Sequence, residues 1–304
     1  MKKVFAFVIG LVLLVGMMSA AAGETAFTLT APSGAPAIAV ATLAKEDPDH
    51  FTFVAADTIA AAFASADSDF IIAPINAGAK LFKAGKSTYQ LAAVITWGNL
   101  VFASQKENFT LADMDGATIT LFGENTINAS VALYVLEQEG IVPAAVEYLA
   151  GAANTQQLLM TDAEAIVMTA EPAITAVKLK NEAITSYALT DELNRISGYD
   201  GFAQAGLFIR AETLETYPEE VKAYLQKIQE AADATDSDVE AVARAAVELE
   251  ILPNEKVAVL AIPGCSIRYT AAAEAKEMIE YTANIDLAQF GGAVPADDFY
   301  YGAE

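Results

Sequence analysis

Short apolar runs alternate with amphipathic stretches along the first part of the chain. Strands are expected over three of these runs, 26–31, 51–55 and 69–73. Helices are expected over three stretches between them, 37–45, 59–64 and 77–84. The apolar runs are short, bounded by turn residues and rich in β-branched or aromatic side chains, as strands are. Three βα units in succession predict a parallel sheet that helices cover.

The next apolar run changes character in its middle. Residues 91–95 have the pattern of a buried strand, and 100–104 resume it. Between them stand a hydroxyl, the only tryptophan, a glycine and an amide, at positions 96–99. We expect one strand that leaves a first lobe, crosses a cleft and enters a second lobe. An ordinary core strand with a β-bulge at Gly98 fits the same residues.

The βα pattern then repeats. Strands are expected over 117–122, 146–149, 165–168 and 184–189, and helices over 129–139, 154–160 and 173–179. The apolar segment 201–210 is interpreted as the return crossing, which pairs with 97–99 in a two-stranded hinge. Helices over 217–232, 238–248 and 271–284 and a strand over 257–262 complete the prediction.

The predicted fold class is therefore α/β, with two βα lobes joined by a two-stranded hinge and a ligand cleft between them. Residues 24–98 plus 207–304 form the expected lobe I, and residues 99–206 the expected lobe II. Residues 1–23 are assigned to a signal peptide.

Polar residues, a glycine and the tryptophan gather where the expected strands end. In lobe I and the hinge these are Ser33, Gly34, Asn76, Thr96, Trp97 and Asn99. Ligands of such sheets bind beyond the carboxyl ends of the strands, so these residues are candidates for a cleft. A plain βα connection, which is common, is the alternative for the loop at Ser33. In lobe II, Asn125, Thr126 and Asn128 precede a helix; they either cap it or share its N-terminus with a ligand.

The N-terminus has the pattern of a secretory signal. Lys2 and Lys3 precede the apolar run 4–18, and the small residues of 19–23 follow, with cleavage expected between Ala21 and Glu24. The apolar run is shorter than the ~20 residues of a membrane-spanning helix, although a membrane anchor is the alternative. We therefore expect an exported protein, periplasmic or extracellular and associated with the cell envelope.

The formal net charge of −23 and the pI near 4.2 exclude two classes of partner. Nucleic acids and anionic membranes are polyanions and repel such a chain. The same acidity favours a soluble monomer. The single cysteine, Cys265, rules out an internal disulfide, and His50 is the only histidine. Zinc binding and histidine-dependent nucleophilic catalysis therefore have almost no residues to use, and no metal, catalytic residue or cofactor is expected.

The order of these elements resembles a known family. The segments that carry the resemblance are 32–36, 73–78, 96–99, 170–172 and 291–300. Together with the signal peptide and the two crossings, they are similar to the type II periplasmic solute-binding proteins of ABC importers, in the branch that binds the thiamine pyrimidine precursor, alkanesulfonates and taurine. A lipobox cysteine, which would hold the protein at a membrane, is missing.

The resemblance implies both a site and a mechanism. It places six residues in the cleft: Ser33, Asn76, Trp97, Asn99, Thr126 and Glu171. The implied function is capture of a small organic solute by hinge closure, with delivery to a membrane permease and its ATPase.

The chemistry of the candidates limits the solute. Trp97 offers a flat apolar face, or packs beside the hinge as core. Asn76 and Asn99 both donate and accept hydrogen bonds, which suits neutral heteroatoms. Glu124 and Glu171 favour a neutral or weakly cationic solute, such as an amino-heterocycle.

Two other functions stay open at this stage. Some pyrimidine-synthesising relatives are enzymes on the same fold that use histidine and cysteine residues, whereas this chain has one of each, far apart. An exported sensory module that binds a ligand without transport is the other alternative, and the amino-acid sequence does not separate it from an importer component.

Overall fold

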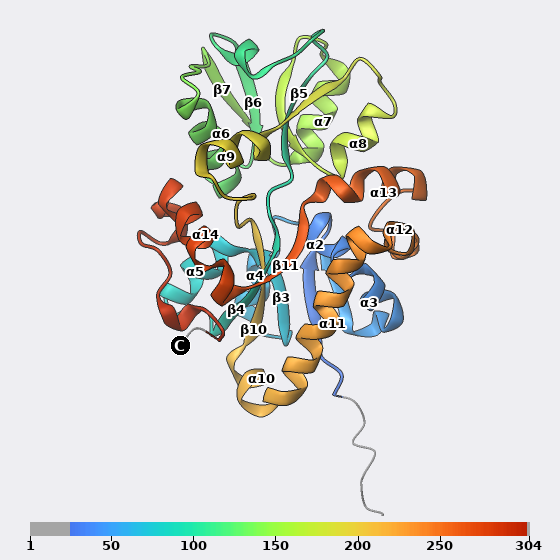
Figure 1. Ribbon diagram of the computed structural model, residues 1–304, viewed down its shortest axis with the longest axis vertical. Coiled ribbons are helices and arrows are strands. Elements are labelled where there is room, and N and C mark those ends of the chain that lie inside the picture. The colour runs from blue at the N-terminus through green and yellow to red at the C-terminus, as the bar shows by residue number, and fades with distance from the viewer. Residues whose placement is uncertain (1–24, 303–304) are drawn as a thin grey trace, which may run out of the picture.

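The computed structural model describes residues 25–302 and contains two β-sheets, each covered by helices (Figure 1). The strands of the first sheet are β1 (Leu29–Pro32), β2 (Phe51–Val54), β3 (Phe70–Pro74), β4 (Tyr89–Thr96), β10 (Ala205–Arg210) and β11 (Ile267–Ala271). Their order is β11-β4-β10-β3-β1-β2. β1 pairs in parallel with β2 and β3, whereas β10 lies antiparallel between β3 and β4. This sheet and its helices are called the first lobe.

Helices cover both faces of the first sheet. They are α2 (Ala35–Ile38), α3 (Ala41–Glu46), α4 (Ala60–Ser65), α5 (Ile75–Lys83), α10 (Ala211–Thr216), α11 (Pro218–Ser237), α12 (Val239–Glu248), α13 (Glu255–Ala261) and α14 (Ala272–Ile285). Short 3₁₀ turns are η1 (Pro48–His50), η3 (Ile262–Cys265), η4 (Leu287–Phe290) and η5 (Asp297–Phe299). The expected βα alternation of the first three units is confirmed.

The second lobe is built on a five-stranded sheet in the order β7-β6-β8-β5-β9. Its strands are β5 (Leu100–Ser104), β6 (Thr118–Phe122), β7 (Ala145–Leu149), β8 (Ile166–Ala170) and β9 (Thr185–Ala188). Its helices are η2 (Leu111–Met114), α6 (Ile127–Gln138), α7 (Ala152–Thr161), α8 (Ala173–Lys178) and α9 (Leu189–Ser197). β5 lies antiparallel to β8 and β9, because it enters this sheet from the first lobe.

The core of the first lobe lies on both faces of its sheet. In β3, Ile71 packs with the cluster that includes α4, α5 and α14, whereas Phe70 and Ile72 pack with the cluster that includes α3, α11 and α12. Successive side chains of a strand point to opposite faces. A sheet covered on both sides therefore needs continuous apolar strands, which is the pattern of β3, β4 and β10.

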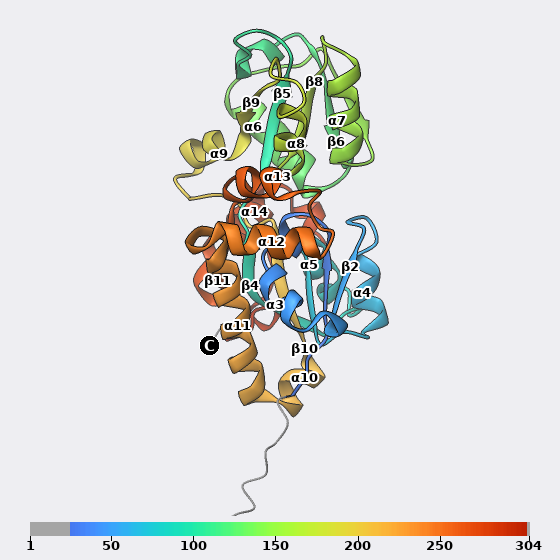
Figure 2. The same ribbon diagram turned by 90° about the vertical axis from the view of Figure 1, so that its right-hand side faces the viewer.

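The chain passes twice between the lobes, as predicted. The first crossing joins β4 to β5, and the second leads from α9 into β10 (Figure 1). The two crossings pair: the Phe202 amide donates to the Trp97 carbonyl at 3.1 Å, and the Gln204 amide donates to the Thr96 carbonyl at 3.1 Å. Figure 2 shows the two lobes one above the other, with α13 at the boundary between them.

Two glycines allow the crossings to approach each other closely. Gly98 and Gly201 have φ angles of +92° and +89°, a region that side chains other than glycine rarely adopt. A Cβ on Gly201 would lie 2.3 Å from the Trp97 carbonyl oxygen, and one on Gly98 would lie 2.5 Å from the Phe202 ring. Each glycine therefore makes room for the opposite crossing.

The strand expected over 257–262 is wrong, because this segment is helical in α13. The side chain of Asn254 accepts a hydrogen bond from the Val257 amide at 3.0 Å, which caps the helix, and Glu255 stands in its first turn. These capping signals outweigh the β-branched composition. The strand of this region is β11, which follows instead and pairs with β4.

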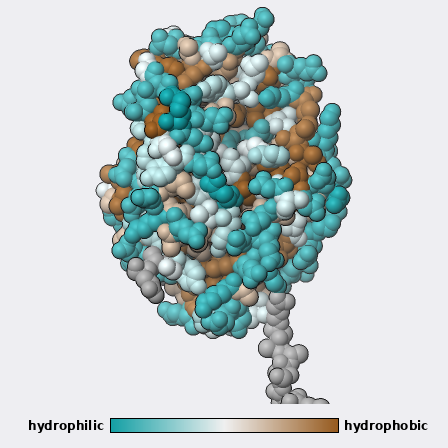
Figure 3. All heavy atoms as spheres, in the orientation of Figure 1, coloured by the Kyte–Doolittle hydropathy of each residue, from teal (hydrophilic) through white to brown (hydrophobic). Residues whose placement is uncertain are grey.

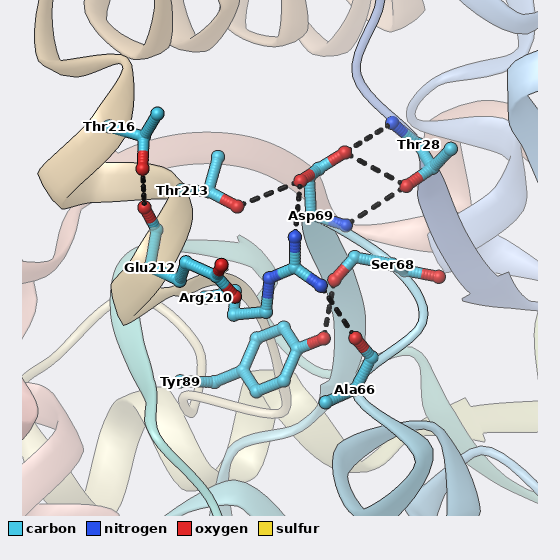
Figure 4. A network of polar contacts seen from close by, with 9 residues as sticks. All are labelled: Thr28, Ala66, Ser68, Asp69, Tyr89, Arg210, Glu212, Thr213 and Thr216. Atoms are coloured by element: carbon cyan, nitrogen blue, oxygen red, sulfur yellow. Dashed lines mark hydrogen bonds and ion pairs between the residues drawn. The ribbon is translucent and has the colours of Figure 1, made fainter.

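A network of polar contacts lies at the amino end of β3, at the opposite end of that strand from the hinge (Figure 4). Asp69 accepts hydrogen bonds from the Thr28 amide at 3.0 Å, from Arg210 Nη2 at 3.1 Å and from the Thr213 hydroxyl at 2.8 Å. Arg210 also donates to the Ala66 carbonyl at 2.6 Å. One carboxylate thus joins the entry to β1, the start of β3, the end of β10 and α10.

The predicted signal peptide lies outside the described residues. Within residues 25–302, no helix has the length and apolar character needed to cross a membrane.

Candidate functional site

Polar side chains converge on the hinge around Gln204, which stands in the second crossing just before β10. Its Nε2 donates to Asn99 Oδ1 at 3.1 Å and to Asn128 Oδ1 at 3.2 Å. Its Oε1 accepts from the Thr96 hydroxyl at 3.4 Å. Thr96 belongs to the first lobe and Asn128 to α6 of the second. One side-chain amide therefore links both lobes.

Asn99 extends this cluster toward β8. The side-chain Nδ2 of Asn99 donates to the backbone carbonyl of Glu171 at 2.5 Å. The backbone carbonyl of Asn99 accepts a hydrogen bond from the backbone amide of Glu171 at 3.0 Å. The first crossing is thereby fixed to the loop that follows β8. Asn99 and Thr96 were both predicted as site residues, and the structure brings them together through Gln204.

Asn76 stands in the first turn of α5, next to the same cluster. The amide of its neighbour Ile75 donates to the Gln204 carbonyl at 3.1 Å. The Oδ1 atom of Asn76 is buried and has no hydrogen-bond partner within residues 25–302. Buried polar atoms are nearly always paired in folded proteins, so this atom marks a place where a partner is missing. Asn76, Asn99, Asn128 and Gln204 are called the amide cluster below.

Ser33 and Gly34 lie where β1 ends, as predicted, but on the far side of β3 from the hinge. The Ser33 amide donates to the Val54 carbonyl at 2.9 Å, and its side chain is exposed. Gly34 has a φ of +103° and starts α2. No hydrogen bond in the described part of the chain joins either residue to the amide cluster, so their contact with a solute stays a prediction.

Thr126 takes the capping role that the sequence left open. Its hydroxyl accepts from the Ala129 amide at 3.5 Å and donates to the Gly123 carbonyl at 2.6 Å. Asn125 is exposed and has a φ of +56°. Asn128, in the first turn of α6, supplies the contact with the cluster.

Trp97 is packed rather than open. Its side chain is 2% exposed, and its Nε1 donates to the Arg268 carbonyl at 2.9 Å. The Arg268 guanidinium lies 4.7 Å from the centre of the indole ring, within the range of a cation–π contact, and forms an ion pair with Asp200. Trp97 and Arg268 line a pocket of about 210 Å³ together with α9, the end of α11 and η3. Core packing describes Trp97 in this conformation, and contact with a solute stays a prediction.

Glu171 lies at the boundary between the lobes. Its carboxylate accepts from the Thr175 hydroxyl at 2.8 Å and from the Thr175 amide at 3.3 Å. A Cβ on Gly264 of the first lobe would lie 3.0 Å from Glu171 Cγ, so the two residues are in close contact. Burial raises the pKa of Glu171, against the lowering effect of the Thr175 hydrogen bonds and of Lys178. This carboxylate is therefore easier to protonate than an exposed one.

The lobes also meet on both sides of the hinge. On one side α8 packs on α13, where hydrophobic side chains reach the surface (Figure 3) and Leu260 is 54% exposed. On the other, the Ser130 hydroxyl of α6 donates to Asp286 at 2.7 Å, and the hydroxyls of Tyr134 and Tyr281 lie 3.2 Å apart. The structure therefore shows the lobes in contact, with the amide cluster at the hinge between these two contacts.

The cysteine and the histidine of the chain stand in different elements, η3 and η1. Cys265 is buried, and burial raises the pKa of its thiol. His50 stands in an exposed turn, where its Nδ1 lies 2.7 Å from Asp47. Among residues 25–302 no group of histidine, cysteine, aspartate and glutamate side chains is arranged to hold a metal ion.

One member of the amide cluster was missed from the sequence. Gln204 lies inside an otherwise apolar crossing, and that isolated polar residue was the signal available. Asn128 was considered with Asn125 and Thr126 as either a helix cap or a ligand contact, but it was left out of the expected site.

Comparison with protein families gives one match: the NMT1/THI5 like family, over residues 61–241. Comparison with curated protein sequences gives no match.

Among solved structures, the chain is similar to an ABC transporter protein from Parabacteroides distasonis, with 19% identity, a TM-score of 0.77 and coverage of 92% of this chain and 100% of that one. It is also similar to the periplasmic aliphatic sulphonate binding protein SsuA from Escherichia coli, with 14% identity, a TM-score of 0.72 and coverage of 92% and 94%. A putative nitrate transport protein from Thermoplasma volcanium has 11% identity, a TM-score of 0.56 and coverage of 88% and 96%. At these identities the likeness concerns the fold. The chain belongs to the NMT1/THI5 like family and has the two-lobed fold of the periplasmic binding proteins of ABC importers.

Proposed function

We propose that this protein is the extracytoplasmic solute-binding component of an ABC importer, and not an enzyme. It captures a small organic solute by hinge closure and delivers it, as a monomer, to a membrane permease driven by an ATPase. Lobe I comprises residues 24–98 and 207–304, and lobe II residues 99–206. The observation that carries the proposal is the amide cluster, which lies on both crossings and on both lobes. Its buried Asn76 Oδ1 atom has no hydrogen-bond partner within residues 25–302.

Closure follows from where these groups stand. Asn76 belongs to the first lobe, Asn128 to the second, and Gln204 to the crossing between them. A solute that contacts both lobes has contacts in the closed state that the open state lacks. It therefore shifts the population toward closure by the difference between its affinities for the two states.

Two further observations support an exported binding protein. The N-terminal sequence has the charged, apolar and small-residue regions of a secretory signal. Two of the similar solved structures are a periplasmic aliphatic sulphonate binding protein and a putative nitrate transport protein. The buried position of Cys265 and the position of His50 in a surface turn, next to Asp47, support binding over catalysis.

A thermal-shift screen of small metabolites tests the proposal. A solute at a hundredfold excess over its Kd should stabilise the folded protein by about 2.7 kcal/mol, a shift of several degrees in Tm. Asn99→Ala should weaken the binding of that solute at least tenfold, because it loses contacts to both Gln204 and Glu171. Asn284→Ala, on the exposed face of α14, is the matched control. If no metabolite raises Tm, or if Asn99→Ala binds as tightly as the control, the proposed site is wrong.

A further inference from the structure

We propose that the amide cluster selects a neutral solute that offers a hydrogen-bond acceptor and a hydrogen-bond donor on the same edge, as a carboxamide, a lactam or a ureide does. The inference rests on the proposed function and names the class of its solute. It is carried by the polar atoms of the cluster that are left open once the contacts within the protein are counted.

The open donors belong to the second lobe. Gln204 Nε2 donates a hydrogen bond to the Oδ1 atom of Asn128. The Nδ2 atom of Asn128 therefore points away from Gln204. No hydrogen bond from that Nδ2 is formed within residues 25–302, so both of its N–H groups are open. Asn99 Nδ2 uses one N–H on the Glu171 carbonyl, and an amide nitrogen carries two. These groups call for an acceptor on the solute.

The open acceptor belongs to the first lobe. Asn76 Oδ1 is buried and unpaired, one residue from the Ile75 amide that donates to the Gln204 carbonyl. Leaving a buried acceptor unpaired is costly, and a donor from the solute removes that cost. An acceptor-only solute pairs with Asn128 but leaves Asn76 unsatisfied. A site of this kind discriminates strongly against solutes that lack the matching group.

The charges around the cluster disfavour an anion. All four side chains of the cluster are neutral amides, and the carboxylate next to them is Glu171. Two cationic side chains near the boundary are already engaged: Arg268 pairs with Asp200 and stacks on Trp97, and Lys178 donates to Ser186. An anion would lose its hydration without gaining a counter-charge, and burial of an unpaired charge is costly.

Gln204 acts here as a positioning residue. Its amide nitrogen fixes the carbonyl ends of both Asn99 and Asn128, so it decides which end of each amide is open. Gln204→Glu replaces this donor by an acceptor. Asn128 would then turn its N–H groups toward residue 204 and its oxygen toward the solute, whereas Asn99 stays held by the Glu171 carbonyl. The substitution therefore inverts the selectivity at Asn128.

Two matched pairs of probes test the inference by calorimetry on the full-length mature protein. They are nicotinamide against nicotinate, and benzamide against benzenesulfonate. We expect each amide to bind at least tenfold more tightly than its anion. Asn128→Asp should reduce amide binding at least tenfold, and Asn76→Leu should narrow the difference between amide and anion. Gln138→Glu, a neutral-to-acidic change at an exposed position of α6, is the control and should bind as the wild type does.

The outcomes separate this inference from the proposed function. Tighter binding of the anions, or amide binding that Asn128→Asp leaves unchanged in a folded variant with a wild-type Tm, overturns the amide-edge proposal. Failure of both amides to bind also overturns it, while a solute found in the metabolite screen would still support the proposed function. If the amides do not bind and the metabolite screen also finds no solute, both the amide-edge proposal and the proposed function are wrong.

Discussion

Gly201→Ala is expected to destabilise the protein by about 3 kcal/mol. Two effects add. The φ of +89° places an alanine in a region that costs roughly 1–2 kcal/mol, and the new Cβ would lie 2.3 Å from the Trp97 carbonyl oxygen, an overlap that typically costs about 1–3 kcal/mol. Relief of the overlap separates the two crossings, so solute binding should weaken together with stability. Urea unfolding and a binding titration measure the two losses.

Gly198→Ala separates strain from overlap. Gly198 ends α9 in the segment before the second crossing with a φ of +75°, and a Cβ there would meet no atom within 4 Å. We expect a loss of about 1 kcal/mol and unchanged solute affinity. Equal losses for Gly198→Ala and Gly201→Ala would mean that the crossings are not in close contact at Gly201.

Asp69→Ala is expected to lower the free energy of unfolding by about 3 kcal/mol. The change removes the acceptor for Thr28, Arg210 and Thr213 (Figure 4) and leaves the Arg210 guanidinium without its carboxylate. Removing one partner of a buried ion pair costs about 3–5 kcal/mol. We expect a loss at the lower end of this range, because the ion pair is only partly buried: the Asp69 side chain is 18% exposed and the Arg210 side chain 24% exposed. Urea unfolding measures the change.

Asp67→Ala, two residues away at an exposed position, is the control for Asp69→Ala and should change stability by less than about 0.5 kcal/mol. Asp69→Ala should leave solute affinity unchanged, because Asp69 stands at the end of β3 opposite the hinge. A loss of less than about 1 kcal/mol would show that the network does not hold the first lobe together.

The fold was largely readable from the sequence, because its signals are local. Apolar runs of strand length alternate with helical stretches, and the change of character at 96–99 marks the first crossing. The error at 257–262 arose where two local signals competed. The run is apolar and contains valine and isoleucine, but the cap at Asn254 lies outside the run and decides for a helix.

The site was readable only in part, because its contacts span long distances in the sequence. Thr96, Asn76 and Asn99 stand at strand ends, so topology alone pointed to them. Gln204 forms hydrogen bonds with Asn99, 105 positions away in the sequence, and with Asn128, 76 positions away. No local sequence pattern predicts such a pairing. The packed position of Trp97 likewise depends on Arg268 of β11, a strand that the sequence reading did not find.

The central claim is that a small solute clamps the two lobes, and the distance between them measures it directly. Asp57→Cys and Glu124→Cys place spin labels on exposed residues in the loops after β2 and β6, on opposite lobes. Cys265 is buried and should stay unlabelled. Double electron–electron resonance measures the distance between the two labels. Without solute we expect a broad distribution of distances, and with a solute from the metabolite screen at saturation we expect only the shortest distances of that distribution. A distribution that the bound solute leaves unchanged would contradict the account.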